Sequence, residues 1–352
     1  MLDPKVESRI LAALNHEEGD RVPIWDYLDN RAIVDHLCPG WTDYHAAMVD
    51  VHRVLGIDMS RGYGACYAEA DDGTVTQSDG VITRKISGRS NWMTEYPIKS
   101  LADLKTYDAK PADEAWVSNW INQMRKQKEN FEPYTMWVPC AGCGFHATYG
   151  LMGQELFSYA IYDDPANVER ILEAETETAC RMAVAAAEAQ VSPVYFIGDD
   201  IAYKGALLYS PDYLRKTFVK SLAKCVEPVK AAGQKVIFHS DGYVMEILDD
   251  MMDVGIDGLN PIEPLAGMDI GYLKKRYGKR LVLVGNVDCS QVLPLGTVDE
   301  VVEATKQCLR DAGHGGGLLI GSSSEIVHST PVENIIAFYE TCRTWGTYPL
   351  KV

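Results

Sequence analysis

The sequence has no run of apolar residues long enough to cross a membrane, which takes about 18 consecutive residues. It also lacks an excess of positive charge: its formal net charge is −17, and an acidic surface of this kind repels a phosphate backbone. The segment from Met1 to Arg9 has no basic-then-apolar signal pattern. We therefore expect a cytoplasmic protein with no membrane span and no nucleic-acid partner.

A compact cysteine framework is missing as well. The nine cysteines are scattered over 352 residues, which is typical of reduced thiols rather than disulfides. Cys140 and Cys143, with His146 nearby, have the spacing of metal ligands. Because no second pair of this kind accompanies them, they are more typical of small residues buried at the end of a strand.

What the sequence does contain is a regular alternation of short apolar strands and helices. Strands are predicted over residues 20–27, 56–58, 136–138, 194–197, 235–238, 258–260, 281–284 and 318–321. Helices are predicted over residues 4–16, 31–37, 44–55, 154–162, 165–189, 211–232, 244–254, 269–277, 298–312 and 331–344. This alternation is typical of parallel strands in βαβ units. A doubly wound sheet would share it, but no Gly-x-Gly-x-x-Gly follows the first strand, which favours a barrel.

Residues 68–98 depart from this alternation and predict a β-hairpin excursion. Thr74 to Thr76 and Val81 to Thr83 alternate as strands on either side of a turn at residues 78–80. No low-complexity linker divides the rest of the chain. We therefore predict a single domain over residues 1–352 that starts with a helical extension.

Polar residues directly follow the later predicted strands. They are Asp199 and Asp200, His239 and Asp241, Asn260 and Glu263, Asn286 and Asp288, and the segment from Ser322 to Glu325 with His328. In an α/β barrel the C-terminal ends of the strands meet at one mouth. The sequence therefore predicts an active site at this mouth.

Each of these polar residues also has a structural interpretation. His239 and Asp241, two positions apart, are suited to bind one metal or to act as an acid–base pair, but Asp241 could instead cap the next helix. Asp199 and Asp200 could contact a substrate or a metal, or could form a turn and a cap. Glu325 lies beyond the last predicted strand, where an ordinary surface loop is the alternative.

Several segments together resemble the uroporphyrinogen decarboxylase superfamily. They are Gly19 to Pro23, Asp199-Asp200 through Pro211, Phe238 to Gly242, Gly285 to Asp288 and Thr330 to Ile335. The resemblance covers essentially the whole chain and implies a (β/α)₈ TIM barrel. It also implies one of two activities: porphyrinogen decarboxylation, or methyl transfer between a small substrate and a corrinoid protein.

Departures from the family pattern separate the two activities. The decarboxylases carry an arginine-rich Arg-Gln-Ala-Gly-Arg element after the first strand and a Gly-His-Gly near the last. Here these places read Trp25 to Arg31, with two aspartates and one arginine, and Ser322 to Glu325. Because the two aspartates would repel a polyanionic tetrapyrrole, the resemblance points to the methyltransferases.

The thiol-directed methyltransferases of this superfamily bind zinc through a His-x-Cys pair and a later cysteine. This sequence keeps the histidine as His239 but has Asp241 and serines where those cysteines would stand. Zinc would lose its soft ligands, so the resemblance implies a harder site of His239, Asp241 and Glu325. Such a site suits an oxygen substrate, as in an O-demethylase that acts on a methoxylated aromatic.

The predicted site residues follow from this interpretation. The predicted catalytic residues are His239, Asp241, Asp199 and Glu325. The predicted substrate-binding residues are Asp200, Asn286, Asn260, Tyr27 and Trp137. The two aromatic side chains could line a pocket for an aromatic ring, or could equally belong to the core.

The predicted function is that of a methyltransferase component that moves a methyl group from a small methylated donor to a corrinoid protein. A partner would supply the corrinoid, because the chain has no Asp-x-His-x-x-Gly cobalamin motif. Two other functions stay open: a metal-free decarboxylase of a small acid that uses His239 and Asp241, and a barrel that binds a ligand without catalysis. A homodimer is one assembly to test.

Overall fold

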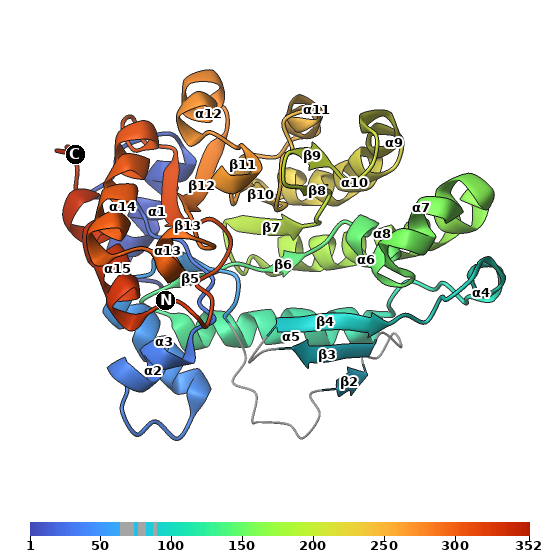
Figure 1. Cartoon of the computed structure of the whole chain (residues 1–352), viewed down its shortest axis with the longest axis horizontal. Coiled ribbons are helices and arrows are strands. Elements are labelled where there is room, and N and C mark those ends of the chain that lie inside the picture. The colour runs from blue at the N-terminus through green and yellow to red at the C-terminus, as the bar shows by residue number, and fades with distance from the viewer. Residues whose placement is uncertain (64–73, 77–81, 87–89) are drawn as a thin grey trace.

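The computed structural model describes residues 1–63, 74–76, 82–86 and 90–352, and most of them build a ring of parallel strands with helices outside it (Figure 1). The strands are β1 (Met59–Ser60), β2 (Thr74–Thr76), β3 (Ile82–Ile86), β4 (Ser90–Glu95), β5 (Met136–Trp137), β6 (Cys140–Ala141), β7 (Val194–Gly198), β8 (Ala202–Tyr203), β9 (Ala206–Leu207), β10 (Lys235–His239), β11 (Gly258–Asn260), β12 (Val282–Val287) and β13 (Leu318–Ser322). The helices are α1 (Pro4–Leu14), α2 (Arg31–Leu37), α3 (Tyr44–Leu55), α4 (Leu101–Thr106), α5 (Glu114–Phe131), α6 (Phe145–Gly150), α7 (Gly153–Asp163), α8 (Pro165–Ala189), α9 (Pro211–Lys216), α10 (Phe218–Ala231), α11 (Leu248–Asp253), α12 (Ile270–Tyr277), α13 (Val292–Leu295), α14 (Val298–Ala312) and α15 (Val332–Trp345). Within the described ranges, no helix combines the length and the apolar character that a membrane crossing requires.

The parallel strands follow one another around the ring. One sheet has the order β13-β12-β11-β10-β7-β6, and β1 pairs with β5 in a second sheet. The segment from Met136 to Ala141 belongs to both sheets, because β5 pairs with β1 and β6 pairs with β7. Parallel bridges from Ile24 to Ile320 and from Trp25 to Met59 join the two remaining edges. Together with the similarity to solved structures reported below, this arrangement confirms the predicted (β/α)₈ barrel.

An inner apolar core fills the ring. It consists of alternate strand residues: Trp25, Met59, Met136, Val138, Val194, Phe196, Ile237, Val282, Val284 and Leu319. Ile10, Ala13 and Leu14 of α1 join this core, so α1 covers the end at which the strands begin. The barrel is therefore closed by apolar packing at one end, and its polar strand ends lie at the other.

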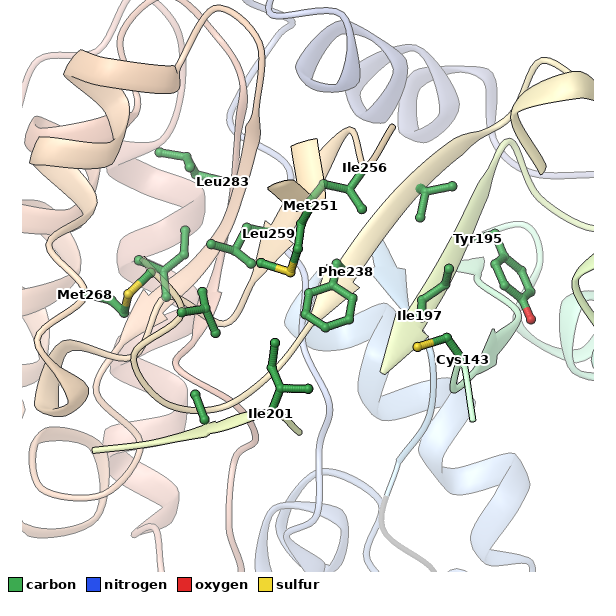
Figure 2. Packing of buried hydrophobic residues seen from close by; sticks show 14 of the residues in the cluster. Cys143, Tyr195, Ile197, Ile201, Phe238, Met251, Ile256, Leu259, Met268 and Leu283 are labelled. Atoms are coloured by element: carbon green, nitrogen blue, oxygen red, sulfur yellow. The ribbon is translucent and has the colours of Figure 1, made fainter. Parts of the chain in front are cut away.

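A second apolar core lies between the strands and the outer helices. Ile197, Phe238 and Leu259 point away from the ring and pack with Met251 and Ile256 from α11 and the turn after it (Figure 2). Because both faces of each strand are buried, a shift of one residue in register would exchange the two cores. The registers of β7, β10 and β11 are thus fixed, and so are the polar residues at their ends.

Several predicted elements differ from those observed. Residues 20–27 form only isolated bridges instead of a strand, because Pro23 has no N–H to donate to a ladder. The helix predicted over residues 211–232 is two helices, α9 and α10, on either side of Thr217. The helix predicted over residues 244–254 begins only at Leu248.

The predicted hairpin belongs to a larger antiparallel sheet. β2 pairs with β3, with Thr74 opposite Arg84, and β3 pairs in turn with β4. This sheet stands at one edge of the molecule, away from the central strands (Figure 1). The predicted turn at residues 78–80 and Val81 lie outside the described residues.

Candidate active site

A layer of polar and aromatic residues lies directly beyond the inner core, where the strands end. Side chains alternate along a strand, so the residue two positions after an inward-pointing one points inward as well. Trp25, Met59, Ile237 and Val284 belong to the inner core. The next inward positions along the same segments are Tyr27, Arg61, His239 and Asn286.

His239, at the end of β10, is held in one orientation by Asn260, at the end of β11. The side-chain nitrogen of Asn260 donates to the backbone oxygen of Val284 at 3.2 Å. The side-chain oxygen of Asn260 therefore faces His239, whose Nδ1 lies 2.6 Å away and must be the donor. With its proton on Nδ1, the ring keeps a free lone pair on Nε2, as in many metal-binding histidines.

Two carboxylates lie around this free Nε2 of His239. Oδ1 of Asp200 is 3.9 Å from it, and Oδ1 of Asp241 is 4.0 Å from it. One ligand atom from each of the three residues lies within 4.8 Å of the other two. The backbone nitrogen of Asp241 donates to Oδ1 of Asp200 at 3.2 Å, which ties the two strand ends together. We call Asp200, His239 and Asp241 the mouth cluster.

Burial and neighbouring charges set the protonation of the mouth cluster. Burial, helped by the positive charge of Arg61, lowers the pKa of His239 to about 4, so its ring is neutral at pH 7. Burial and the carboxylates of Asp200 and Glu263 raise the pKa of Asp241 to about 7. Oδ1 of Asp241 is buried and lacks a hydrogen-bond partner among the described residues. A bound cation would remove the cost of this unpaired oxygen.

Glu325 lies beside the mouth cluster rather than in it. A cavity of about 350 Å³ is lined by Asp241, Glu263, Ser324 and Glu325, among others. Burial raises the pKa of Glu325, and the nearby Asp29 raises it further. Asp200, and not Glu325, is the third residue with a ligand atom within 4.8 Å of those of His239 and Asp241. Glu325 is instead placed to contact a molecule in this cavity.

Asp199 anchors the start of α6 with both of its carboxylate oxygens. Oδ2 accepts hydrogen bonds from the backbone nitrogens of Cys143 and Phe145, at 2.9 and 3.2 Å, and from the Cys143 thiol at 2.7 Å. Oδ1 accepts one from the backbone nitrogen of His146 at 3.0 Å. These contacts give Asp199 a positioning role at the start of α6, and its catalytic role stays a prediction.

The side chains of the two asparagines that were predicted to bind substrate make hydrogen bonds within the protein. Asn260 orients His239, as described above. The side-chain nitrogen of Asn286 donates to the backbone oxygen of Ile262 at 3.2 Å, which links the end of β12 to the loop after β11. Both side chains thus hold the mouth in shape.

The two predicted aromatic residues lie in different places. Tyr27 is at the mouth, where the Arg61 guanidinium lies 5.3 Å from its ring centroid. Trp137 lies on the outer side of the ring, 4.8 Å from Phe131 of α5 between ring centroids, and it is buried there. Trp137 is therefore a packing residue, which was the alternative to its predicted pocket role. Sequence reasoning missed Arg61 altogether.

Cys140 and Cys143 do not converge on a common cation position within the part of the chain that the structure describes. The Cys143 thiol donates to Asp199, whereas the Cys140 sulfur lies near Gly198, on the inner side of the ring. Burial raises the pKa of both thiols. Neither cysteine is therefore prepared as a thiolate ligand.

Comparison with known proteins adds the family context. A family model described as uroporphyrinogen decarboxylase (URO-D) matches residues 84–345. The methylcobamide:CoM methyltransferase MtaA of Methanosarcina barkeri is 33% identical over 169 residues, which cover 48% of this chain and 46% of that protein. A methylated-thiol–coenzyme M methyltransferase of Methanosarcina mazei is 20% identical over 226 residues, or 63% of this chain and 56% of that protein. The chain thus spans about half the length of the curated relatives it matches.

Solved structures share the architecture over nearly the whole chain. A methyltransferase from Methanosarcina mazei superposes with a TM-score of 0.74 at 24% identity, covering 96% of this chain and 98% of that one. A B12-independent methionine synthase from Shewanella sp. W3-18-1 gives a TM-score of 0.51 at 11% identity, covering 92% of this chain and 98% of that one. At these identities the similarity concerns the fold.

Proposed function

The chain belongs to the uroporphyrinogen decarboxylase family, and on that basis we propose that it is a corrinoid-dependent methyltransferase component. It moves a methyl group from a small methylated substrate to a corrinoid that a partner protein carries. The substrate is a methyl ether, for which a methoxylated aromatic is our leading example. The similarity to methyltransferases of Methanosarcina supports methyl transfer.

The mouth cluster is the observation that carries this proposal. A neutral imidazole nitrogen and two carboxylate oxygens are ligands that zinc accepts. The unpaired Oδ1 of Asp241 and the fixed Nε2 lone pair of His239 both fit such an ion. Asp200, His239 and Asp241 would hold the zinc, which would supply a Lewis acid to the substrate oxygen.

The composition of the mouth cluster favours an oxygen substrate over a thiol. The cluster contains no thiolate, and carboxylates are harder ligands than thiolates. A metal with hard ligands has a stronger preference for oxygen than one held by sulfur. The methyl group would therefore leave an ether oxygen that becomes an alcohol or phenol.

The remaining residues orient the site and supply a proton. Asn260 keeps the Nε2 lone pair of His239 directed at the cluster, and Asp199 fixes the start of α6 beside Asp200. Glu325 has a raised pKa, so it holds its proton closer to neutral pH than an ordinary carboxyl does. It can pass this proton to the oxygen that loses its methyl group.

A metal-free decarboxylase is less well supported. Such an enzyme would use His239 and Asp241 as an acid–base pair, but a pKa of about 4 leaves the His239 ring without a proton at neutral pH, so Asp241 alone would have to supply it. Release of carbon dioxide from a panel of small acids would nevertheless favour it.

The test is formation of methylcobalamin from free cob(I)alamin. Zinc-loaded protein is mixed anaerobically with methoxylated aromatic acids and other methyl donors, and the visible absorbance is followed. The wild type and the matched surface variant His36→Ala are expected to methylate the cobalt, whereas His239→Ala is expected to lose this activity. Absence of methylcobalamin with every donor would contradict the proposal.

A further inference from the structure

Arg61 is a cation at a mouth whose other charged groups are mainly carboxylates. It follows Met59 by two positions, and Met59 points into the inner core. The Arg61 guanidinium lies 5.3 Å from the ring centroid of Tyr27 and 5.2 Å from that of Phe196. Its Nε is buried and has no hydrogen-bond partner among the described residues. The proposed function gives this donor no role.

The surroundings of Arg61 hold it in place and put it next to the mouth cluster. Contact with two ring faces restrains a guanidinium by cation–π attraction. The Arg61 guanidinium is also within hydrogen-bond reach of the Cys140 side chain, so its Nε is the donor without a partner among the described residues. The charge of Arg61 adds to burial in lowering the pKa of His239, and it opposes burial at Glu325. Arg61 is therefore within electrostatic reach of both residues.

We propose that Arg61 binds a carboxylate of the substrate and so selects methyl ethers that carry an acidic group. The planar fork of a guanidinium matches the two oxygens of a carboxylate. An acidic substrate would give the buried Nε a partner, whereas a neutral ether of the same shape would leave it unpaired. This inference rests on the proposed function, because it names the substrate class of the same site.

Calorimetry tests the inference without methyl transfer. Zinc-loaded protein is titrated with 4-methoxybenzoate and, in parallel, with the uncharged 4-methoxybenzamide. We expect the wild type to bind the carboxylate at least ~10-fold more tightly than the amide, the size typical of a charge-assisted hydrogen bond. Arg61→Gln is expected to lose this preference and to bind the amide as the wild type does. Arg53→Gln, in which an exposed arginine paired with Asp50 is replaced, is the matched control and should keep the preference.

A second variant covers the case in which Arg61→Gln does not fold. Arg61→Lys keeps the charge but not the fork, so an intermediate preference is expected. The inference is overturned if the wild type shows no preference or does not bind the carboxylate. A preference that keeps its wild-type size in Arg61→Gln, or in Arg61→Lys where Arg61→Gln does not fold, also overturns it.

The outcomes for this inference and for the proposed function can be told apart. An Arg61-dependent preference in protein that methylates no cob(I)alamin would reject the proposed function alone. If the wild-type protein methylates cob(I)alamin but binds the carboxylate and the amide equally tightly, the Arg61 inference alone is rejected.

Discussion

Replacing Asn260 with alanine tests whether the residues behind His239 prepare it for a metal. Asn260 is 1% exposed, and it joins Nδ1 of His239 at 2.6 Å to the backbone oxygen of Val284 at 3.2 Å. The alanine variant leaves both buried groups without a partner. It also removes the contact that fixes the proton on Nδ1 and the orientation of the ring.

Two effects of known size should follow from Asn260→Ala. Each of the two buried groups that loses its partner costs about 1–3 kcal/mol, so the free energy of unfolding should fall by about 2–6 kcal/mol. Loss of the hydrogen bond behind a metal-binding histidine lowers the metal affinity by roughly 10- to 100-fold. Urea denaturation measures the first effect, and competition with a zinc-chelating dye measures the second.

Asn334→Ala is the matched control for this experiment. Asn334 is 2% exposed and donates to the backbone oxygens of Leu293 and Gly296 at 2.9 and 2.8 Å, away from the mouth cluster. Its loss should lower stability by a similar amount and leave the zinc affinity unchanged. The reasoning is refuted if Asn260→Ala binds zinc as tightly as the wild type, or if both variants lose the same affinity.

Three further predictions concern other residues of the mouth and its surroundings. Because the pKa of Asp241 is raised to about 7, zinc must displace a proton from this carboxyl at lower pH, and the zinc affinity should rise about tenfold per pH unit below pH ~7 and level off above it. A zinc affinity that calorimetry finds independent of pH would exclude Asp241 as a ligand. Asp199→Ala removes the anchor of α6 and should lower the free energy of unfolding by about 2–4 kcal/mol, whereas a variant as stable as the wild type in urea would contradict the anchoring role. Trp137→Leu should lower the melting temperature but leave the affinity for 4-methoxybenzoate unchanged. A weaker affinity in calorimetry would indicate that Trp137 contacts the substrate.

The barrel was predictable because both faces of its later strands are apolar. Residues 194–197 and 235–238 are continuous apolar runs that end at polar residues, and they form β7 and β10. The first segment of the ring carried a weaker signal. Pro23 interrupts its hydrogen bonding, and closure depends on single bridges such as that from Trp25 to Met59, which only the assembled ring reveals.

The site was predictable in part. The spacing of His239 and Asp241 favoured a shared centre, and the structure places both in the mouth cluster. Asp199 and Asp200 are adjacent, so they point in different directions, and sequence alone could not decide which of them faces the mouth. The alternation along β7 decides it, because Phe196 points inward and Asp200 lies on the same side as Phe196.

Arg61 escaped sequence reasoning for a related reason. β1 is only two residues long, so the run of apolar residues before Arg61 is too short to indicate which side chains point inward. The placement of Met59 in the inner core supplies that information. The loop after β13 has no periodicity from which the direction of Glu325 could be inferred, so the sequence could not decide whether it lies in the mouth cluster or beside it.

The metal content of the purified protein shows whether Asp200, His239 and Asp241 form a zinc site. Zinc is measured by mass spectrometry on anaerobically prepared wild type, His239→Ala and Glu325→Gln, the last of which alters a carboxyl beside the mouth cluster but outside it. We expect about one zinc per chain in the wild type and in Glu325→Gln, and none in His239→Ala. No stoichiometric metal in the wild type, or zinc retained by His239→Ala, would contradict a metal site formed by Asp200, His239 and Asp241.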